Sequence, residues 1–186
     1  RQSALCSRKK GIIAAGGEYI MFLDADDYLE TEACRILYER MQKERVDILH
    51  FAAAIENAGV DEKRLKNMQA FLKPYKGRLA DRAVFTGCFR HKRYQLSICN
   101  KIYRTEICKR AVDDIPEEKL YKANDLILYT AISLQANSYK GVDGPALYHY
   151  SFGSGSTGSK NLSLEQFENY CYEAKAAKMF RQLIQG

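Results

Sequence analysis

The alternation of hydrophobic and polar positions along the chain predicts helices and strands that follow one another in sequence. Apolar residues at helical spacing predict helices over residues 3–15, 61–72, 79–89 and 163–184, and two more that begin after residues 29 and 125. Short runs of strand-forming residues predict strands at residues 19–23, 46–54 and 146–150. A chain with this alternation is expected to fold as an α/β domain with helices packed against a sheet.

The stretch from Gly17 to Leu29 contains the most distinctive chemistry. Its apolar run, Tyr19–Leu23, is short enough to be a strand buried on both faces. The helix that follows the stretch is predicted to have Glu30 and Glu32 in its first turn. The run ends in Asp24-Ala25-Asp26-Asp27, and carboxylates this close repel one another unless a cation joins them. Ligands bind at the carboxyl ends of strands in α/β sheets, where hard oxygen donors suit Mg²⁺ or Mn²⁺ shared with substrate phosphates. The alternative is a solvated acidic turn that caps the next helix.

Length and composition place the chain among soluble globular proteins. Its 186 residues suit one domain with a substantial core, and the apolar share of 46% and charged share of 28% are ordinary. No stretch reaches the roughly 18 apolar residues of a membrane span, and no signal peptide is evident. The chain begins at Arg1, so we expect the native N-terminus to lie upstream.

The six cysteines show neither a CxxC pair nor a histidine at zinc-finger spacing. Several lie in apolar surroundings, such as Cys34 beside Ile36 and Cys99 beside Ile98. This usage predicts reduced, mostly buried thiols in a cytoplasmic protein and argues against a disulfide framework.

The net charge of +6 is unevenly distributed. Residues 61–110 contain 14 Lys or Arg against 4 Asp or Glu, including the run Arg90-His91-Lys92-Arg93. Such a basic region could contact anionic lipid headgroups, phosphorylated acceptors or nucleic acid, or could be a solvated surface. No nucleic-acid-binding motif accompanies it, so no nucleic-acid partner is expected.

The text around the acidic turn resembles the family 2 glycosyltransferases of the GT-A fold. Residues 7–27 read SRKKGIIAAGGEYIMFLDADD, close to the family's usual ARNxGIxxAxGEYIxFLDxDD, with Lys9 in place of the Asn. The resemblance implies a mixed sheet flanked by helices, and a Mg²⁺ or Mn²⁺ ion held by Asp26. In this family Asp24 would assist with the metal or bind the donor ribose, and Arg8 would lie near the donor diphosphate. Asp27 would orient the acceptor or cap a helix.

Two later stretches extend the resemblance. Residues 97–104 read SICNKIYR, similar to the family's VWNKLYRREL, and this places Lys101 toward the acceptor or a phosphate, or in a structural salt bridge. Residues 120–127 resemble the segment with the family's ED pair, with Asn124 replacing the Glu. The Asp of that pair is the family's catalytic base, which makes Asp125 the candidate; the alternative is that Asp125 only caps the helix.

A third stretch lies near the end of the chain. Residues 146–150 and the Gly/Ser loop from Gly153 to Ser159 resemble the family's PLYYYR(x)nS segment, whose loop commonly covers the donor diphosphate. The family's Arg is Ser151 here. His149 would complete the metal shell, as a His from this region does in some relatives, or would serve in packing.

The family normally opens with strands that bind uracil and ribose and end in DDGSxD, and no such text is present here. The resemblance therefore implies an N-terminally truncated GT-A domain with open sheet edges, which would favour a homodimer. Within one domain of residues 1–186 it implies a donor and metal part over 1–55, an acceptor part with the base over 56–160, and a terminal helix over 161–186.

Three functions follow from these observations. The first is an inverting, metal-dependent transferase that moves a sugar from a UDP-linked or similar nucleotide-sugar to a surface polysaccharide or lipid-linked acceptor. The second is a catalytically inactive relative that binds a sugar or a partner, suggested by the missing N-terminal text and by Lys9, Asn124 and Ser151. The third is a basic binding module built on residues 61–110. The expected location is the cytoplasm, including the inner face of the membrane.

Overall fold

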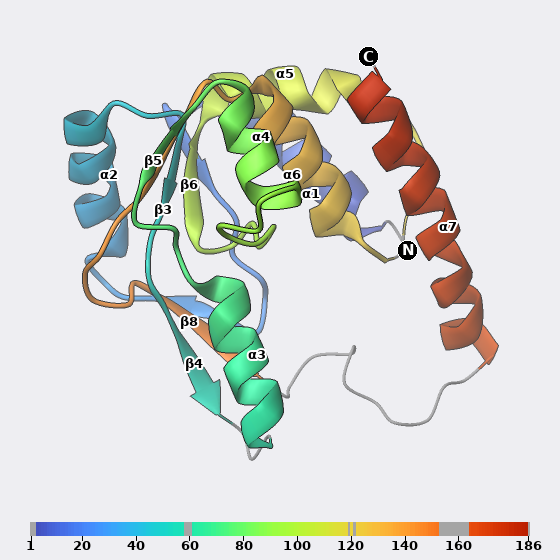
Figure 1. Cartoon of the computed structure of the whole chain (residues 1–186), viewed down its shortest axis with the longest axis horizontal. Coiled ribbons are helices and arrows are strands. Elements are labelled where there is room, and N and C mark those ends of the chain that lie inside the picture. Colours follow the sequence, from blue (N-terminus) through green and yellow to red (C-terminus); the bar gives the residue numbers. More distant parts are fainter. Residues whose placement is uncertain (1–2, 58–60, 119, 121, 153–163, 186) are drawn as a thin grey trace.

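A computed structural model describes residues 3–57, 61–118, 120, 122–152 and 164–185. The strands are β1 (Tyr19–Met21), β2 (Tyr28–Leu29), β3 (Ile48–His50), β4 (Ala53–Asn57), β5 (Arg78–Ala80), β6 (Lys101–Arg104), β7 (Ser138–Gly141) and β8 (Tyr148–Phe152). The helices are α1 (Ala4–Ala14), α2 (Ala33–Glu44), α3 (Glu62–Leu72), α4 (Arg82–Phe89), α5 (Thr105–Asp114), α6 (Asn124–Gln135) and α7 (Leu164–Gln185). The predicted α/β class is confirmed (Figure 1).

The strands form two mixed sheets. The larger has the order β1-β6-β3-β7-β5, and its middle strand β3 pairs antiparallel with β6 and parallel with β7. The smaller has the order β2-β8-β4, with β8 antiparallel to β2 and parallel to β4. The chain passes from the larger to the smaller sheet three times, between β1 and β2, between β3 and β4, and between β7 and β8.

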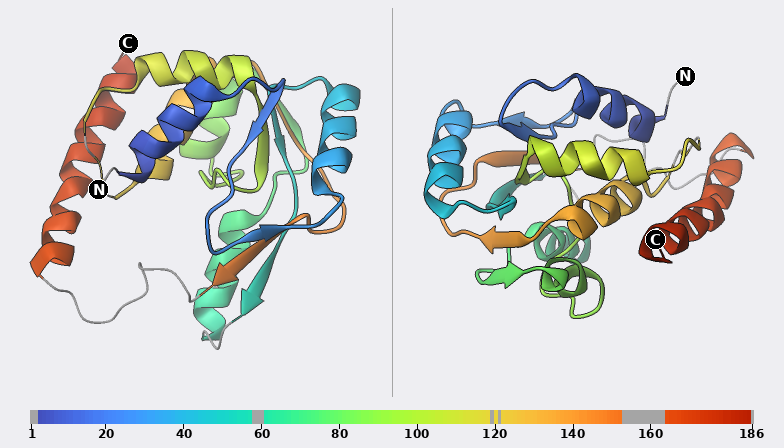
Figure 2. Two further views of the ribbon diagram at one scale, coloured as in Figure 1. Left: turned by 180° about the vertical axis from the view of Figure 1, so that it is seen from behind. Right: turned by 90° about the horizontal axis from the view of Figure 1, so that it is seen from above.

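Helices cover the larger sheet on two sides. Helix α2 lies on one side, while α1, α5 and α6 pack together on the other (Figure 2). Helix α7 packs against α6. The buried core fills the space between the sheet and these helices, where α5 and α6 bury Ile107, Cys108, Ile127 and Tyr129.

Local sequence signals explain several helix ends. Ser3 precedes α1 and its Oγ accepts a hydrogen bond from the Cys6 N–H at 3.3 Å, and Asp61 caps α3 in the same way toward Arg64 N at 3.0 Å. Helix α2 ends at Arg45, whose φ of 49° is left-handed and stops the helix. The buried apolar stripe of α2 consists of Ala33, Leu37 and Met41.

Four local predictions need correction. The strand at 19–23 is shorter and only half-buried, because β1 lies at one end of the larger sheet among the described strands. The run 46–54 is divided between β3 and β4, which join different sheets. The predicted helix 79–89 begins later, because its first residues pair with β7 as β5. Glu30 lies outside α2, which starts at Ala33 with Glu32 as its N-cap.

The cysteine prediction holds in part. Cys6, Cys34, Cys88, Cys99 and Cys108 are free thiols, but Cys34 is exposed and Cys6 is half-buried. The Gly/Ser loop from Gly153 to Ser159 lies outside the described residues. Among the described helices, none is both long and apolar enough to cross a bilayer.

Candidate active site

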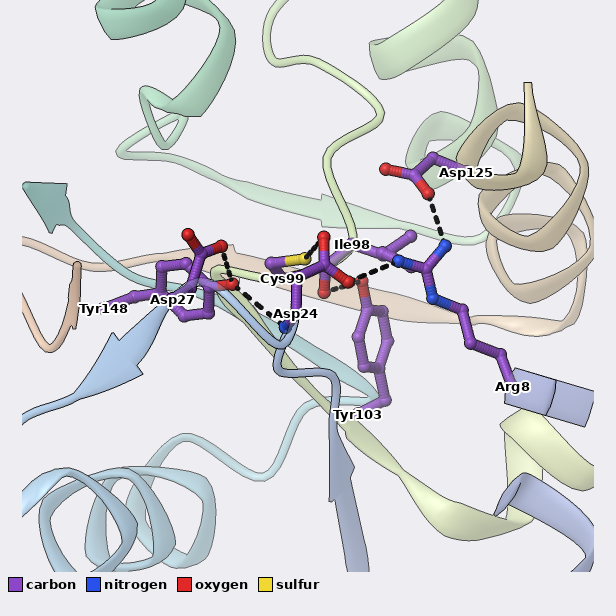
Figure 3. A network of polar contacts seen from close by, with 8 residues as sticks. All are labelled: Arg8, Asp24, Asp27, Ile98, Cys99, Tyr103, Asp125 and Tyr148. Carbon is purple, nitrogen blue, oxygen red and sulfur yellow. Dashed lines mark hydrogen bonds and ion pairs between the residues drawn. The ribbon is translucent and has the colours of Figure 1, made fainter. Parts of the chain in front are cut away.

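The acidic turn, residues 24–27, lies at the junction of the two sheets. It follows Phe22, which is buried, and the N–H of Asp27 donates to the Asp24 carbonyl at 3.1 Å, which closes the turn. Because β1 belongs to the larger sheet and β2 to the smaller, the turn faces groups from both sheets. Figure 3 shows that side chains from α1, α6, β8 and the loop before β6 meet there.

The guanidinium of Arg8 joins two carboxylates that are distant in sequence. Its Nη2 lies 2.7 Å from Asp24 Oδ1, and its Nη1 lies 2.8 Å from Asp125 Oδ1. The Arg8 side chain is 16% exposed, against 40% for Asp24 and 34% for Asp125. Burial lowers the pKa of Arg8, but Asp125 and Asp24 raise it above its ordinary value, so the guanidinium stays charged. Three predicted site residues therefore lie together around one cation (Figure 3).

Asp125 lies in the first turn of α6 but does not cap that helix. The N-cap is Ala123, in a left-handed conformation and without a side-chain cap hydrogen bond. Burial raises the pKa of Asp125 above its ordinary value, and the charge of Arg8 opposes that rise. Beside it, the side-chain oxygen of Asn124 is buried and has no hydrogen-bond partner among the described residues.

Asp27 is anchored to β8 by both carboxylate oxygens. The Tyr148 hydroxyl donates to Oδ2, and the Ser151 N–H donates to Oδ1 at 2.8 Å. Burial raises the pKa of Asp27, and these two hydrogen bonds lower it in part. The suggestion that Asp27 caps a helix is wrong, because α2 begins at Ala33 with Glu32 as its N-cap. Asp27 instead fixes the acidic turn to the smaller sheet.

Two further residues of this site were missed in the sequence. Tyr148 is fully buried, and its hydroxyl accepts from the Asp24 N–H at 3.4 Å as well as donating to Asp27. Cys99, from the loop before β6, places Sγ 3.6 Å from Asp24 Oδ2, and burial raises the pKa of its thiol. A Tyr in a strand and a Cys in an apolar run both resemble core residues, so neither gave a signal of its own.

The two remaining candidates make other contacts. Lys101 is fully buried and donates to the carbonyls of Gln95, at 3.2 Å, and Ser97. In the described part of the chain it forms no salt bridge, so the prediction of a structural salt bridge is wrong. Burial lowers the pKa of Lys101 to about 7. His149 lies between Glu30 and Glu56, with ring nitrogens 2.7 and 2.8 Å from their carboxylates.

The acidic turn suits a divalent cation that is shared with a substrate. Asp26 is exposed, while Asp24 is half-buried and already bonded to Arg8. The described residues contain no group of three or more His, Cys, Asp or Glu side chains placed to hold a metal. One or two carboxylates fit Mg²⁺ or Mn²⁺, which commonly keep waters and take their other oxygens from phosphates.

Comparison with known proteins identifies a family and a fold. The family described as Glycosyl transferase family 2 matches residues 6–107. The fold resembles S. aureus TarS 1-349 in complex with UDP-GlcNAc (TM-score 0.60, 24% identity, covering 92% of this chain and 45% of that one). It also resembles the UDP complex of TarS 1-349 (TM-score 0.54, 25% identity, 91% and 43%). The chain spans less than half the length of these structures, and no curated protein sequence matches it significantly.

Proposed function

The chain belongs to glycosyl transferase family 2 and has a GT-A fold, and from this premise we propose that it acts in sugar transfer from a nucleotide-sugar. The proposed reaction is metal-dependent and inverts the anomeric carbon. The acceptor is a hydroxyl of a surface polysaccharide or a lipid-linked saccharide. The observation that supports this most is the pairing of Asp24 and Asp125 through Arg8, because it brings a donor-side carboxylate and the proposed base into one site.

The donor would bind at the acidic turn. A divalent ion would be held by Asp26, with Asp24 assisting or bonding the ribose, and it would supply Lewis-acid stabilisation of the leaving diphosphate. Arg8 offers a planar fork of donors that suits phosphate oxygens, and it already lies beside Asp24. TarS has been crystallised with UDP-GlcNAc and with UDP, which supports a UDP-linked donor for this chain.

Asp125 would act as the base. Its raised pKa makes it a stronger proton acceptor than an ordinary surface carboxylate. It takes the proton of the acceptor hydroxyl while that oxygen attacks the anomeric carbon from the face opposite the nucleotide. A single displacement of this kind inverts the configuration, as in inverting hydrolases.

Arg8 connects these two parts of the reaction. Its guanidinium donates to both Asp24 and Asp125. A donor diphosphate would compete for the same N–H groups, so donor binding weakens the bond to Asp125. The carboxylate of Asp125 then becomes available to the acceptor hydroxyl once the donor is in place.

An inactive, sugar-binding relative is the second candidate. It is favoured by Asn124, which occupies the place of the family's Glu and has a side-chain oxygen without a partner among the described residues. Lys9, in place of the family's Asn, is also turned away from the acidic turn, because its Nζ donates to the Ile115 carbonyl at 2.9 Å.

Release of UDP from UDP-sugars, followed with and without Mn²⁺, separates these candidates. A transferase releases UDP in the presence of acceptor saccharides, and NMR of the product shows an anomeric configuration opposite to that of the donor. The Asp125→Asn variant should bind UDP normally but release little product. Sugar binding with no UDP release under any condition would instead support the inactive relative.

A further inference from the structure

Helix α3 lies at the edge of the molecule and contributes little to the core (Figure 1). Among its described side chains only Leu72 is buried. Leu65, Met68 and Phe71 are half-exposed and lie outside the core cluster. Arg64, Asn67, Met68 and Phe71 line a shallow hollow on the helix, and in the described part of the chain no residue of another element lines it.

Exposed cations surround these apolar side chains. Lys63 and Lys66 lie on α3, and Lys73 follows directly after it. The segment 90–93 after α4 joins the same surface, because the guanidinium of Arg93 lies 5.4 Å from the centre of the Tyr75 ring. Figures 1 and 2 both show α3 and α4 on the side of the molecule that faces away from α1.

The basic charge is concentrated on this surface. Residues 61–93 contain ten Lys or Arg against three Asp or Glu, so the rest of the chain is close to neutral within a net charge of +6. In the described structure, Lys63, Lys73, Arg90 and Lys92 form no ion pair with a carboxylate. Of the other basic residues expected from the sequence, Lys101 is buried, Arg104 and Arg110 pair with acidic residues, and Lys109 is exposed on α5, a different helix. Within the surface itself, Lys66 pairs with Glu62 and Lys76 with Asp143.

We propose that α3 and segments 73–76 and 90–93 form a surface that docks on an anionic lipid bilayer. A basic amphipathic helix whose apolar side chains lie outside the core is typical of proteins bound at a membrane interface. Met68 and Phe71 enter the headgroup region, and the cations bind anionic lipid. Each cation near such a surface contributes about fivefold to partitioning. We favour lipid over nucleic acid because the cations surround aliphatic and aromatic side chains on a helix and no nucleic-acid-binding motif is present.

Flotation of the full chain with lipid vesicles tests this proposal. Vesicles of two parts phosphatidylcholine to one part phosphatidylglycerol should bind it, high salt should release it, and pure phosphatidylcholine should not bind it. The triple variant Lys63→Glu, Lys73→Glu, Lys92→Glu should bind on the order of a hundredfold more weakly. Phe71→Ser should weaken binding at low salt although it changes no charge.

The matched control is the triple variant Lys43→Glu, Lys109→Glu, Lys178→Glu. It has the same change in charge at exposed positions on α2, α5 and α7. Its docking surface is intact, so it should lose much less vesicle binding than the first triple variant, although the two have the same net charge. Both triple variants should bind UDP equally, which separates this proposal from the proposed function. Equal loss of vesicle binding in the two variants, or a preference for an RNA oligonucleotide that Phe71→Ser leaves unchanged, would overturn the proposal.

Discussion

The hydroxyl of Tyr148 provides the most specific test of how the acidic turn is held in place. It donates to Asp27 Oδ2 and accepts from the Asp24 N–H, so it connects β8 to both ends of the turn. Tyr148→Phe removes this oxygen and keeps the buried ring. Of its two described partners, the Asp27 carboxylate then keeps the Ser151 N–H, at 2.8 Å.

The expected cost follows from the charge of the acceptor. A hydrogen bond to a charged group contributes about 1.5–3 kcal/mol, so the free energy of unfolding should fall by about that amount. In a domain of this size the melting temperature should fall by roughly 3–12 °C. The loosened turn should also bind UDP with Mn²⁺ more weakly, by roughly tenfold, which corresponds to about 1.4 kcal/mol.

Tyr139→Phe provides the control for this prediction. Tyr139 is also fully buried, and its hydroxyl makes hydrogen bonds with His50 at 2.8 Å and the Tyr75 N–H at 3.2 Å, outside the acidic turn. Thermal unfolding and calorimetric UDP titration should show lower stability for both variants but weaker UDP binding for Tyr148→Phe alone. Equal UDP affinity in Tyr148→Phe and the unmodified chain would refute the role of Tyr148 in positioning the turn.

Three further predictions concern the charged groups. Arg8→Lys should weaken UDP binding by roughly tenfold in a titration, because one ammonium cannot replace the planar fork that bonds Asp24 and Asp125 together; unchanged affinity would count against the role of Arg8. Asp125→Asn should reduce sugar transfer by about 10²–10⁴-fold while UDP affinity stays within about twofold, and a comparable loss of UDP affinity would show that Asp125 does not act as a base. Hydrogen bonding to Glu56 and then Glu30 raises the pKa of His149, so its stabilising effect is complete below its unfolded pKa and is lost as the pH rises through the folded pKa. Denaturant unfolding should therefore show His149→Gln to be most destabilising near pH 6 and less so near pH 9, whereas a constant difference would contradict this.

Much of the fold could be predicted from local patterns. The helices α1, α2, α3 and α6 follow hydrophobic spacing, and α1 and α3 also begin at N-cap side chains, Ser3 and Asp61. Long-range pairing could not be predicted in this way. The run 46–54 reads as one strand, but β3 and β4 join different sheets because their partners, β7 and β8, are distant in sequence. The strand β7 was not predicted, since Tyr139 and Gly141 are its only buried positions.

In the candidate site, too, the residue types could be predicted from the sequence but the long-range contacts could not. Its carboxylates and Arg8 were identified through the family resemblance, and the structure places Arg8, Asp24 and Asp125 in contact. The anchoring of Asp27 by Tyr148 was not predicted, because a tyrosine in an apolar strand gives no sign of where its hydroxyl points. The burial of Lys101 against carbonyl groups could not be predicted either, because lysine is almost never fully buried.

In the proposed function the acidic turn, together with Arg8, binds the diphosphate of a nucleotide through a divalent ion. Calorimetric titration of UDP into the full chain, with Mn²⁺ and with a chelator, tests it most directly. Binding should be saturable, should need Mn²⁺ and should be lost in Asp26→Ala. Glu32→Ala, which removes an exposed carboxylate outside the turn, is the matched control and should still bind. UDP binding that is equally strong in the chelator and in Asp26→Ala, or no binding by the unmodified chain, would contradict it.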